Sequence, residues 1–369
     1  MKINFITTES IDNFSGGWSG NSYNLYKALQ SKGEVLHYIG PVKPPITKWE
    51  KYYSRVLRFF GFKSKFYYFS FNRLHKIQKI IESKIDGSVD YTFFMGSTHW
   101  LNFTPHNSYG AFLDANFRTY FDNNLKTNQF QKKDIARIEN LEKRWLENAT
   151  HIFWASEWAK NEALKQYDLK NNNHYVVGIG GNLFVPGNTN YKGDIHFLFM
   201  AQDFYLKGGD LAFEAFKNVY AKHPHTKLYI LGQQPPAIVL DHPGIVYPGY
   251  LKKNIPEELN QFTNILSESF CLIHPTKSDT IAQVIIECGY FGCPSIAPAR
   301  FAIPEIIKHN ETGILLKPVF TSKDIEEAML LLIENPKLYS TMRLNVRERF
   351  ISTFTYEAVC NKILGEINQ

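Results

Sequence analysis

Two stretches of the chain show the same succession of hydrophobic and polar positions. "KINFIT", at residues 2–7, alternates apolar and polar residues as a strand does, and after "SGGWSG" the stretch "NSYNLYKALQSKG" spaces its apolar residues as a helix does. Further on, the strand pattern "IHFLFMA", the glycine-bearing loop "QDFYLKGGD" and the helix pattern "LAFEAFKNVYAKHP" follow in the same order. A strand, a glycine loop and a helix open a parallel, doubly wound sheet. Their recurrence predicts an α/β protein with two Rossmann-like domains.

The two domains are expected to join where the apolar periodicity stops. The stretch "NLFVPGNTNYKGD" is rich in Asn, Gly and Pro, which predicts a linker at about 184–194. A chain of 369 residues also exceeds what one hydrophobic core usually supports. The predicted divisions are an N-terminal domain at 1–183, a C-terminal domain at 184–355, and a helix at 356–369 that packs back on the N-terminal domain.

The composition is that of an ordinary globular protein, with 44% hydrophobic and 21% charged residues. The cysteines form no CxxC pair and have no zinc-finger spacing, so we expect buried free thiols in a reducing compartment. They are Cys271, Cys288, Cys293 and Cys360. The opening "MKINFITTES" has too few apolar residues in a row for a signal-peptide core or a membrane span. We therefore expect a cytoplasmic protein.

Polar side chains follow two predicted buried strands in the first half of the chain. His99 comes shortly after "YTFFMGS", and Asp114 comes directly after the apolar run "YGAFL". In α/β sheets, ligands collect at the carboxyl ends of the strands, so both positions are of functional interest. We expect His99 to be structural. Asp114 is a candidate catalytic residue, with the alternative that it caps the segment "ANFRTYF".

A pair of carboxylates is the most informative feature of the second half. In "SDTIAQVIIECGYFGCPSIAP", residues 278–298, seven uncharged residues separate Asp279 from Glu287. Apolar residues recur there at helical spacing, which predicts a helix with Asp279 at its N-terminal mouth and Glu287 about two turns inside. A helix N-terminus favours a phosphate, and a nearby carboxylate can accept hydrogen bonds from a ribose diol. The alternative is an ordinary helix with Asp279 as N-cap and Glu287 on a solvated face.

This stretch resembles the carboxylate-x7-carboxylate signature of the retaining glycosyltransferases of family four, which have the GT-B fold of two Rossmann-like domains facing a cleft. Four further stretches resemble family segments and occur in the family's order across nearly the full chain. They are "SGGWSG", "SEWAKNEALKQY", "FMAQDFYLKGGD" and "IPEIIKHNETGILL". The resemblance implies transfer of a sugar from a nucleotide-sugar donor to a glycan or lipid-linked cell-envelope acceptor, with retention at the anomeric carbon.

The resemblance also implies roles for individual residues. Glu287 would bind the donor ribose, Lys207 would neutralise the diphosphate, and Asp279 would hold hydroxyls of the sugar. Gly16 and Gly17 would let the backbone approach the diphosphate from the opposite domain. The implied catalytic residues are Asp114, Asp279 and Lys207, and the implied donor-binding residues are Gly16, Gly17, Lys207, Asp279, Thr280, Ile281, Ala282 and Glu287.

Other interpretations of these residues stay open. Lys207 could be a solvated loop lysine, and the glycine pair could form a plain turn. Many relatives have Arg near the position of Gln202, Gly at that of Ala282, and glycines where this chain has "RFA" at 300–302. These departures could reduce activity, so a catalytically degenerate sugar-nucleotide-binding protein is an alternative. A Rossmann oxidoreductase is a weaker one, because "SGGWSG" lacks the G-x-G-x-x-G spacing.

No cofactor or metal is expected beyond the nucleotide-diphosphate sugar, which is a co-substrate. The sequence contains no Asp-x-Asp pair, the arrangement that holds a divalent cation under the diphosphate in the other large glycosyltransferase fold. The leaving diphosphate would instead be stabilised by Lys207 and a helix N-terminus.

One segment carries the whole excess of positive charge. Residues 43–84 contain 11 Lys or Arg against 2 Glu, a balance of +9 in a chain of net charge +6, and they interleave eleven aromatic residues. This mixture suits an anionic membrane surface or a lipid-linked acceptor, which predicts peripheral attachment at the inner face of the cell membrane. The alternatives are a pair of core helices with a solvated basic face and, less favoured, single-stranded nucleic acid.

Overall fold

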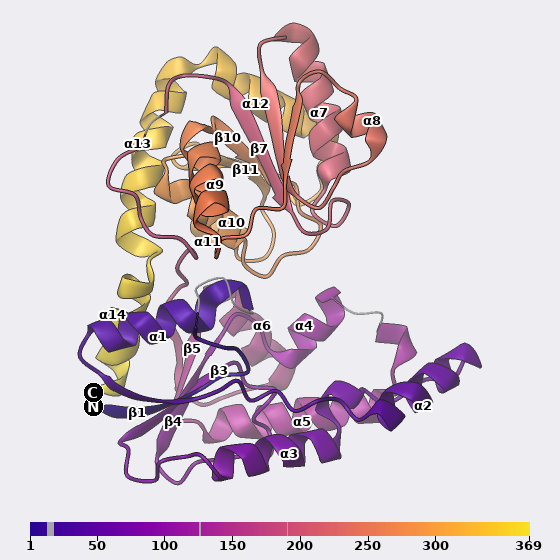
Figure 1. The fold of residues 1–369 in the computed structure, drawn as a ribbon, viewed down its shortest axis with the longest axis vertical. Coiled ribbons are helices and arrows are strands. Elements are labelled where there is room, and N and C mark those ends of the chain that lie inside the picture. The colour runs from indigo at the N-terminus through magenta and orange to yellow at the C-terminus, as the bar shows by residue number, and fades with distance from the viewer. Residues whose placement is uncertain (13–17, 125–126, 190) are drawn as a thin grey trace. The chain divides into compact units, whose positions relative to one another are not determined.

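The chain forms two compact units, each built on its own sheet (Figure 1). The computed structural model describes residues 1–12, 18–124, 127–189 and 191–369. Unit 1 comprises Met1–Gly178 and Val359–Gln369, and unit 2 comprises Ile179–Ala358. The units therefore divide at 178/179 and 358/359, whereas the sequence patterns placed the divisions at 183/184 and 355/356.

Unit 1 is a six-stranded, wholly parallel sheet flanked by helices, in the order β2-β1-β3-β4-β5-β6. Parallel strands need cover on both faces, which explains runs such as "YTFFM" in which all five residues are buried. The strands are β1 (Lys2–Ile6), β2 (Val35–Ile39), β3 (Tyr91–Met95), β4 (Ser108–Leu113), β5 (His151–Trp154) and β6 (His174–Val176). The helices are α1 (Asn21–Ser31), α2 (Lys48–Phe59), α3 (Phe71–Glu82), α4 (Phe117–Asn124), α5 (Lys132–Asn148) and α6 (Glu157–Tyr167), with 3-10 turns η1 (Trp18–Gly20), η2 (Tyr67–Phe69) and η3 (Thr127–Gln129).

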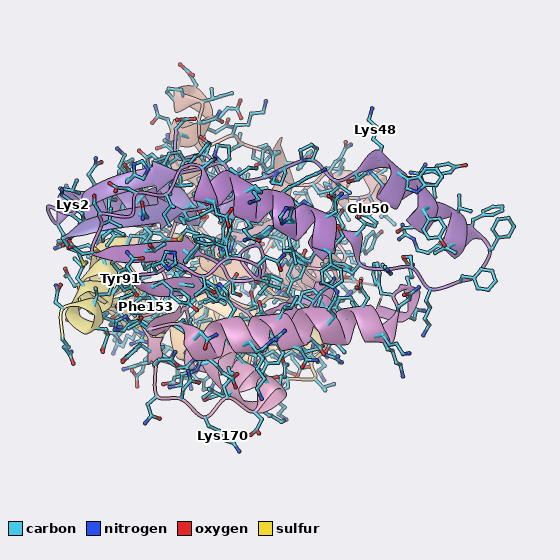
Figure 2. All side chains as sticks on the ribbon, turned by 90° about the horizontal axis from the view of Figure 1, so that it is seen from below. Lys2, Lys48, Glu50, Tyr91, Phe153 and Lys170 are labelled. Atoms are coloured by element: carbon cyan, nitrogen blue, oxygen red, sulfur yellow. The ribbon has the colours of Figure 1, made fainter. Side chains whose placement is uncertain are left out.

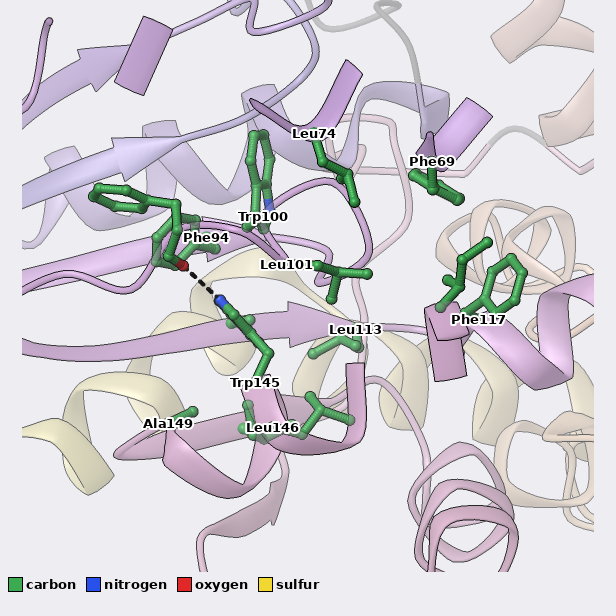
Figure 3. Close-up of a cluster of buried hydrophobic side chains, with 14 of the residues drawn as sticks. Phe69, Leu74, Phe94, Trp100, Leu101, Leu113, Phe117, Trp145, Leu146 and Ala149 are labelled. Carbon is green, nitrogen blue, oxygen red and sulfur yellow. Dashed lines mark hydrogen bonds between the residues drawn. The ribbon is translucent and has the colours of Figure 1, made fainter. Parts of the chain in front are cut away.

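Aromatic and aliphatic side chains together fill the core of unit 1 between the sheet and its helices (Figure 3). Phe94 of β3 lies edge-to-face against Trp145 of α5, with ring centroids 5.3 Å apart. The Trp145 indole donates a hydrogen bond to the carbonyl oxygen of Phe103 at 2.9 Å, so its polar edge is satisfied inside the core. This packing fixes α5 against the sheet.

Unit 2 is also a six-stranded parallel sheet, in the order β12-β11-β10-β7-β8-β9. Its first strand, β7, lies in the middle between β8 and β10, so the winding direction reverses between β7 and β10. The strands are β7 (His196–Ala201), β8 (Lys227–Gly232), β9 (Ile245–Gly249), β10 (Cys271–Ile273), β11 (Ser295–Pro298) and β12 (Gly313–Leu316). The helices are α7 (Gly209–Lys222), α8 (Ala237–Leu240), α9 (Pro256–Glu268), α10 (Gln283–Tyr290), α11 (Ile303–Ile306), α12 (Ser322–Glu334) and α13 (Pro336–Thr353), while α14 (Tyr356–Ile367) begins in unit 2 and ends in unit 1. The prediction of two parallel doubly wound sheets is confirmed.

The helix cap and the free thiols expected from the sequence are confirmed as well. The Ser156 hydroxyl caps α6 by accepting a hydrogen bond from the Ala159 backbone N–H at 3.1 Å. The four cysteines are buried and unbridged. Among the described residues, no helix is both long and apolar enough to cross a bilayer.

The basic segment 43–84 divides into two parts with opposite exposure. Its second part contributes to the core, because Phe66, Tyr67 and Phe69 are buried and α3 turns apolar residues into the hydrophobic cluster of unit 1, although Tyr68 and Phe71 are exposed. In α2, by contrast, Ser54 is the one buried residue. The alternative of a core helix pair is therefore correct for α3 and wrong for α2.

Candidate functional site

The two loops that carry the predicted donor-binding residues meet where the winding of the unit 2 sheet reverses. One loop follows β7 and the other follows β10, and these strands are neighbours in the sheet. The backbone N–H of Lys277 donates to the Leu206 carbonyl oxygen at 3.0 Å, which joins the two loops directly. In open α/β sheets such a reversal leaves a crevice at the carboxyl ends of the strands, where ligands bind.

Lys207 and Asp279 form an ion pair across these loops. The Lys207 ammonium lies 2.7 Å from Asp279 Oδ2 and donates to the Ser278 carbonyl oxygen at 2.8 Å. The same Oδ2 contacts His274 Nε2 at 3.2 Å. Burial would raise the pKa of Asp279, but the His274 hydrogen bond and the Lys207 charge outweigh it and hold that pKa below its usual range. Lys207 is thus not a freely solvated loop lysine.

The glycine after Lys207 makes this approach of the loops possible. Gly208 has a φ of +76°, and a Cβ added there would lie 2.2 Å from the Pro275 carbonyl oxygen. Gly208 also precedes the first residue of α7, so the loop turns directly into the helix. Only glycine combines this backbone conformation with such a close contact.

The helix predicted at the carboxylate motif begins later than expected. Helix α10 begins at Gln283, so Thr280, Ile281 and Ala282 lie in the loop before it and Asp279 lies outside it. Glu287 is therefore little more than one turn inside the helix, not two. Asp279 does not cap the helix because its carboxylate is occupied by Lys207 and His274, four residues before α10 begins.

Glu287 is 4% exposed, which excludes the solvated face that was its alternative. Its Oε1 forms an ion pair with Lys253 and accepts a hydrogen bond from the Asn182 backbone N–H at 3.2 Å. Lys253 lies in the loop after β9, with its ammonium 5.0 Å from the centre of the Phe262 ring. Sequence reasoning missed Lys253. The signal that could have identified Lys253 is its position just after a strand of the parallel sheet, and the same reasoning singled out Asp114.

The structure also places the residues that depart from the pattern of the family that the sequence resembles. Gln202 is exposed in the loop after β7, and Ala282 is buried at 1% exposure. In "RFA", Phe301 has a φ of +53°, a left-handed conformation that favours glycine. A non-glycine residue there stores strain of about 1–2 kcal/mol.

In unit 1, Asp114 stands at the carboxyl end of β4. Its Oδ2 accepts a hydrogen bond from the Trp18 indole at 3.2 Å. The helix that follows, α4, is capped by Asn116, whose Oδ1 accepts from the Thr119 backbone N–H at 3.0 Å. The alternative role of Asp114 as the cap is therefore wrong. Gly16 and Gly17, expected near the diphosphate, lie outside the described residues.

His99 packs against the aromatic core, edge-to-face with Phe69 at 5.2 Å. Burial, with smaller contributions from the charges of Arg73 and Lys43, lowers the pKa of His99 to about 3. The imidazole is thus neutral near pH 7, in keeping with the structural role expected of it.

A buried carboxylate that the sequence did not single out fixes the loops around Asp114. Glu142 of α5 is fully buried and accepts hydrogen bonds from Ser97 and Thr98 after β3, from the Phe117 N–H, and from the Tyr167 hydroxyl at 2.6–2.8 Å. Burial raises the pKa of Glu142 although these donors oppose the shift. One side chain thereby links the carboxyl ends of β3 and β4.

Glu142→Ala is expected to lower the free energy of unfolding by about 3 kcal/mol, because it leaves several buried donors without their acceptor. Glu147→Ala on the same helix is the control: Glu147 is 38% exposed and its ion pair with Lys143 is on the surface, so a change of at most about 0.5 kcal/mol is expected. Urea unfolding of the two variants measures the difference. An equal loss of unfolding free energy in the two variants would show that Glu142 has no special role in stability.

Among the described residues, no three His, Cys, Asp or Glu side chains gather as a metal site requires. Two hollows of unit 2, each of about 550 Å³, lie apart from the residues discussed above. One lies between β9 and α9, and the other lies beside the start of α13. We base the candidate site on the paired charges at the sheet reversal.

Comparison with known proteins adds a family match over part of the chain and a fold. Residues 184–349 match the family described as Glycosyl transferases group 1. No curated protein matches the chain. Among solved structures, the sucrose-phosphate synthase of Thermosynechococcus elongatus aligns with a TM-score of 0.71 and 14% identity, over 100% of this chain and 98% of that one. The Anabaena protein Alr3699/HepE in complex with UDP-glucose aligns with a TM-score of 0.66 and 13% identity, over 100% of this chain and 99% of that one.

A third structure, WaaG, a glycosyltransferase involved in lipopolysaccharide biosynthesis, aligns with a TM-score of 0.66 and 12% identity over 98% of both chains. These likenesses confirm the predicted GT-B fold. The family match falls on unit 2, where the two lysine–carboxylate pairs lie.

Proposed function

We propose that this GT-B chain, whose residues 184–349 match the group 1 glycosyl transferases, moves a sugar from a nucleoside diphosphate sugar to a glycan or lipid-linked cell-envelope acceptor. The observation that carries the proposal is the Lys207–Asp279 ion pair at the reversal of a parallel sheet. A lysine there is a site for phosphates, and a carboxylate beside it is a site for sugar hydroxyls. We propose the cytoplasm as its location, at the inner face of the cell membrane.

In the proposed complex, the donor diphosphate takes the Lys207 ammonium that Asp279 holds in the free protein. Asp279 then turns its oxygens to hydroxyls of the sugar, while His274 keeps the carboxylate in place. Glu287 accepts hydrogen bonds from the ribose, and Asp114 stands at the acceptor side. The proximity of Lys207 and Asp279 supports this exchange.

The proposed reaction breaks the bond between the anomeric carbon and the diphosphate oxygen, and the electron pair goes to that oxygen. A new bond forms between the anomeric carbon and the acceptor oxygen, whose proton passes to the departing diphosphate oxygen. Lys207 stabilises the charge that grows on the diphosphate, an electrostatic contribution that needs no metal ion. Retention at the anomeric carbon and independence from metal are part of the proposal.

A sugar-nucleotide-binding protein without transfer activity is the second candidate. It is favoured by the strained Phe301 and by Gln202, which leaves Lys207 without the neighbouring Arg of many relatives. Tight donor binding with no transfer to a broad range of acceptors would support it.

Nucleotide binding is the test common to both candidates. We expect one of UDP, GDP or ADP, or its sugar derivative, to raise the melting temperature, since a ligand at 100 times its Kd adds about 2.7 kcal/mol of stability. UDP and UDP-glucose come first, because Alr3699/HepE was solved with UDP-glucose. Glu287→Ala is expected to abolish the response in thermal-shift and calorimetric measurements. No response to any nucleotide would contradict both candidates.

A further inference from the structure

An amphipathic helix in unit 1 presents its apolar face to solvent. In α2 and the residue after it, Trp49, Tyr52, Tyr53, Phe59 and Phe60 recur at i, i+3, i+4, i+10 and i+11, which places them on one side of the helix. These side chains are between 54% and 83% exposed. The apolar stripe of a surface helix normally faces the core, so this inverted orientation indicates a partner outside the unit.

The other sides of α2 are basic or turned inward. Six basic residues and one acidic residue, Glu50, occur in 48–65, a balance of +5, and the basic ones are Lys48, Lys51, Arg55, Arg58, Lys63 and Lys65. In Figure 2 the Lys48 side chain points outward from α2, whereas Glu50 lies on the opposite, inner side of the helix. Cations therefore lie along one side of the aromatic stripe.

Contacts at both ends hold the helix in this orientation. The Arg58 guanidinium donates to Gln129 Oε1 at 3.2 Å, and Ser64 pairs with the backbone around Gln129 and Phe130. Near the start of α2, the Asn72 amide donates to the Thr47 hydroxyl at 3.2 Å. The aromatic stripe is thus a fixed surface of unit 1.

We infer that residues 48–65, which we call the α2 surface, dock on an anionic lipid bilayer. Aromatic rings suit the level of the headgroups and the basic side chains suit anionic headgroups, so both components of the surface are used at once. A second copy of the chain fits poorly, because a two-fold dimer would oppose +5 with +5. The inference does not depend on the transferase proposal.

Vesicle binding tests the inference in the full-length protein. We expect co-sedimentation with phosphatidylcholine vesicles that contain phosphatidylglycerol, little with phosphatidylcholine alone, and weaker binding as salt rises. Replacing Lys48, Lys51 and Arg55 by Gln is expected to weaken partition about a hundredfold, since each cation near the surface contributes about 1 kcal/mol. Replacing Trp49, Phe59 and Phe60 by Ser is expected to weaken it by a factor of at least ten.

The controls replace well-exposed residues elsewhere in the chain. Lys170→Gln with Lys323→Gln controls for loss of charge, and Phe184→Ser with Val319→Ser controls for loss of apolar surface, so binding should stay within about twofold. Equal binding to both kinds of vesicle, or unchanged binding by the α2 variants, would overturn the inference. The inference would also be overturned if the protein formed a dimer, or bound single-stranded oligothymidine tightly, and the α2 variants abolished that dimer or that binding.

Discussion

Lys207→Met is expected to lower the rate of sugar transfer by about a hundredfold to a thousandfold, the range found when one preorganised charge-stabilising group is lost. The Lys207 ammonium lies at the sheet reversal, 2.7 Å from Asp279. Methionine keeps much of the side-chain volume and removes the charge together with the hydrogen bonds to Ser278 and Asp279. The fold should change little, because Asp279 retains its contact with His274. Initial rates with saturating donor, together with the melting temperature, measure both effects.

Lys277→Met is the matched control for this charge. Lys277 lies in the loop after β10, and its ammonium pairs with Asp210 at 3.2 Å, where both side chains are more than 40% exposed. We expect its rate to stay within about twofold of the wild type. An equal loss of transfer rate in the two variants would mean that activity depends on the net charge of the loops rather than on Lys207 itself. A wild-type rate in Lys207→Met would refute the role of Lys207.

Gly208→Ala is expected to abolish most transfer and to destabilise unit 2 by about 3 kcal/mol. The left-handed conformation alone costs an alanine about 1 kcal/mol. The new Cβ would also lie 2.2 Å from the Pro275 carbonyl oxygen, so the loops after β7 and β10 must move apart. Overpacking of this kind costs about 1–3 kcal/mol more. Because Lys207 and Asp279 lie on the two separated loops, their pairing is lost as well.

The Gly193→Ala variant separates the cost of the left-handed backbone conformation from the cost of the close contact with Pro275. Gly193 has a φ of +94°, but no atom lies within 4 Å of the Cβ that alanine would add. We therefore expect the conformational cost of about 1 kcal/mol and an unchanged transfer rate. Urea unfolding and initial rates of both variants make the comparison. Similar losses of stability would show that the contact with Pro275 relaxes without cost.

The sheets could be predicted from sequence because parallel strands are buried on both faces and leave unbroken apolar runs, as in β3. The site could be predicted only as separate residues. Glu287 lies in helix α10, and Lys253, 34 positions earlier, lies in the loop after β9, so their pairing depends on the order of strands in the sheet. The start of α10 was misplaced because the Asp279 carboxylate, a good helix cap, is held by Lys207 and His274 instead.

Helices α2 and α3 show another limit of sequence patterns. Both space their apolar residues as amphipathic helices do, and periodicity identifies such a stripe without telling what it faces. In α3 the stripe includes Leu74 and Ile77, which are buried in the core of unit 1, whereas in α2 it is exposed. Only the packing of the whole unit distinguishes the two.

Unit 1 consists of two separated pieces of chain, and this affects the order in which the protein can fold during synthesis. Val359, Cys360 and Ile363 belong to its second piece and are fully buried. Domains generally fold as units as they leave the ribosome, N-terminal ones first. Here the first unit lacks part of its core until all of unit 2 has been translated. Unit 2, whose sequence Ile179–Ala358 is continuous, can therefore reach its complete native structure before unit 1 does.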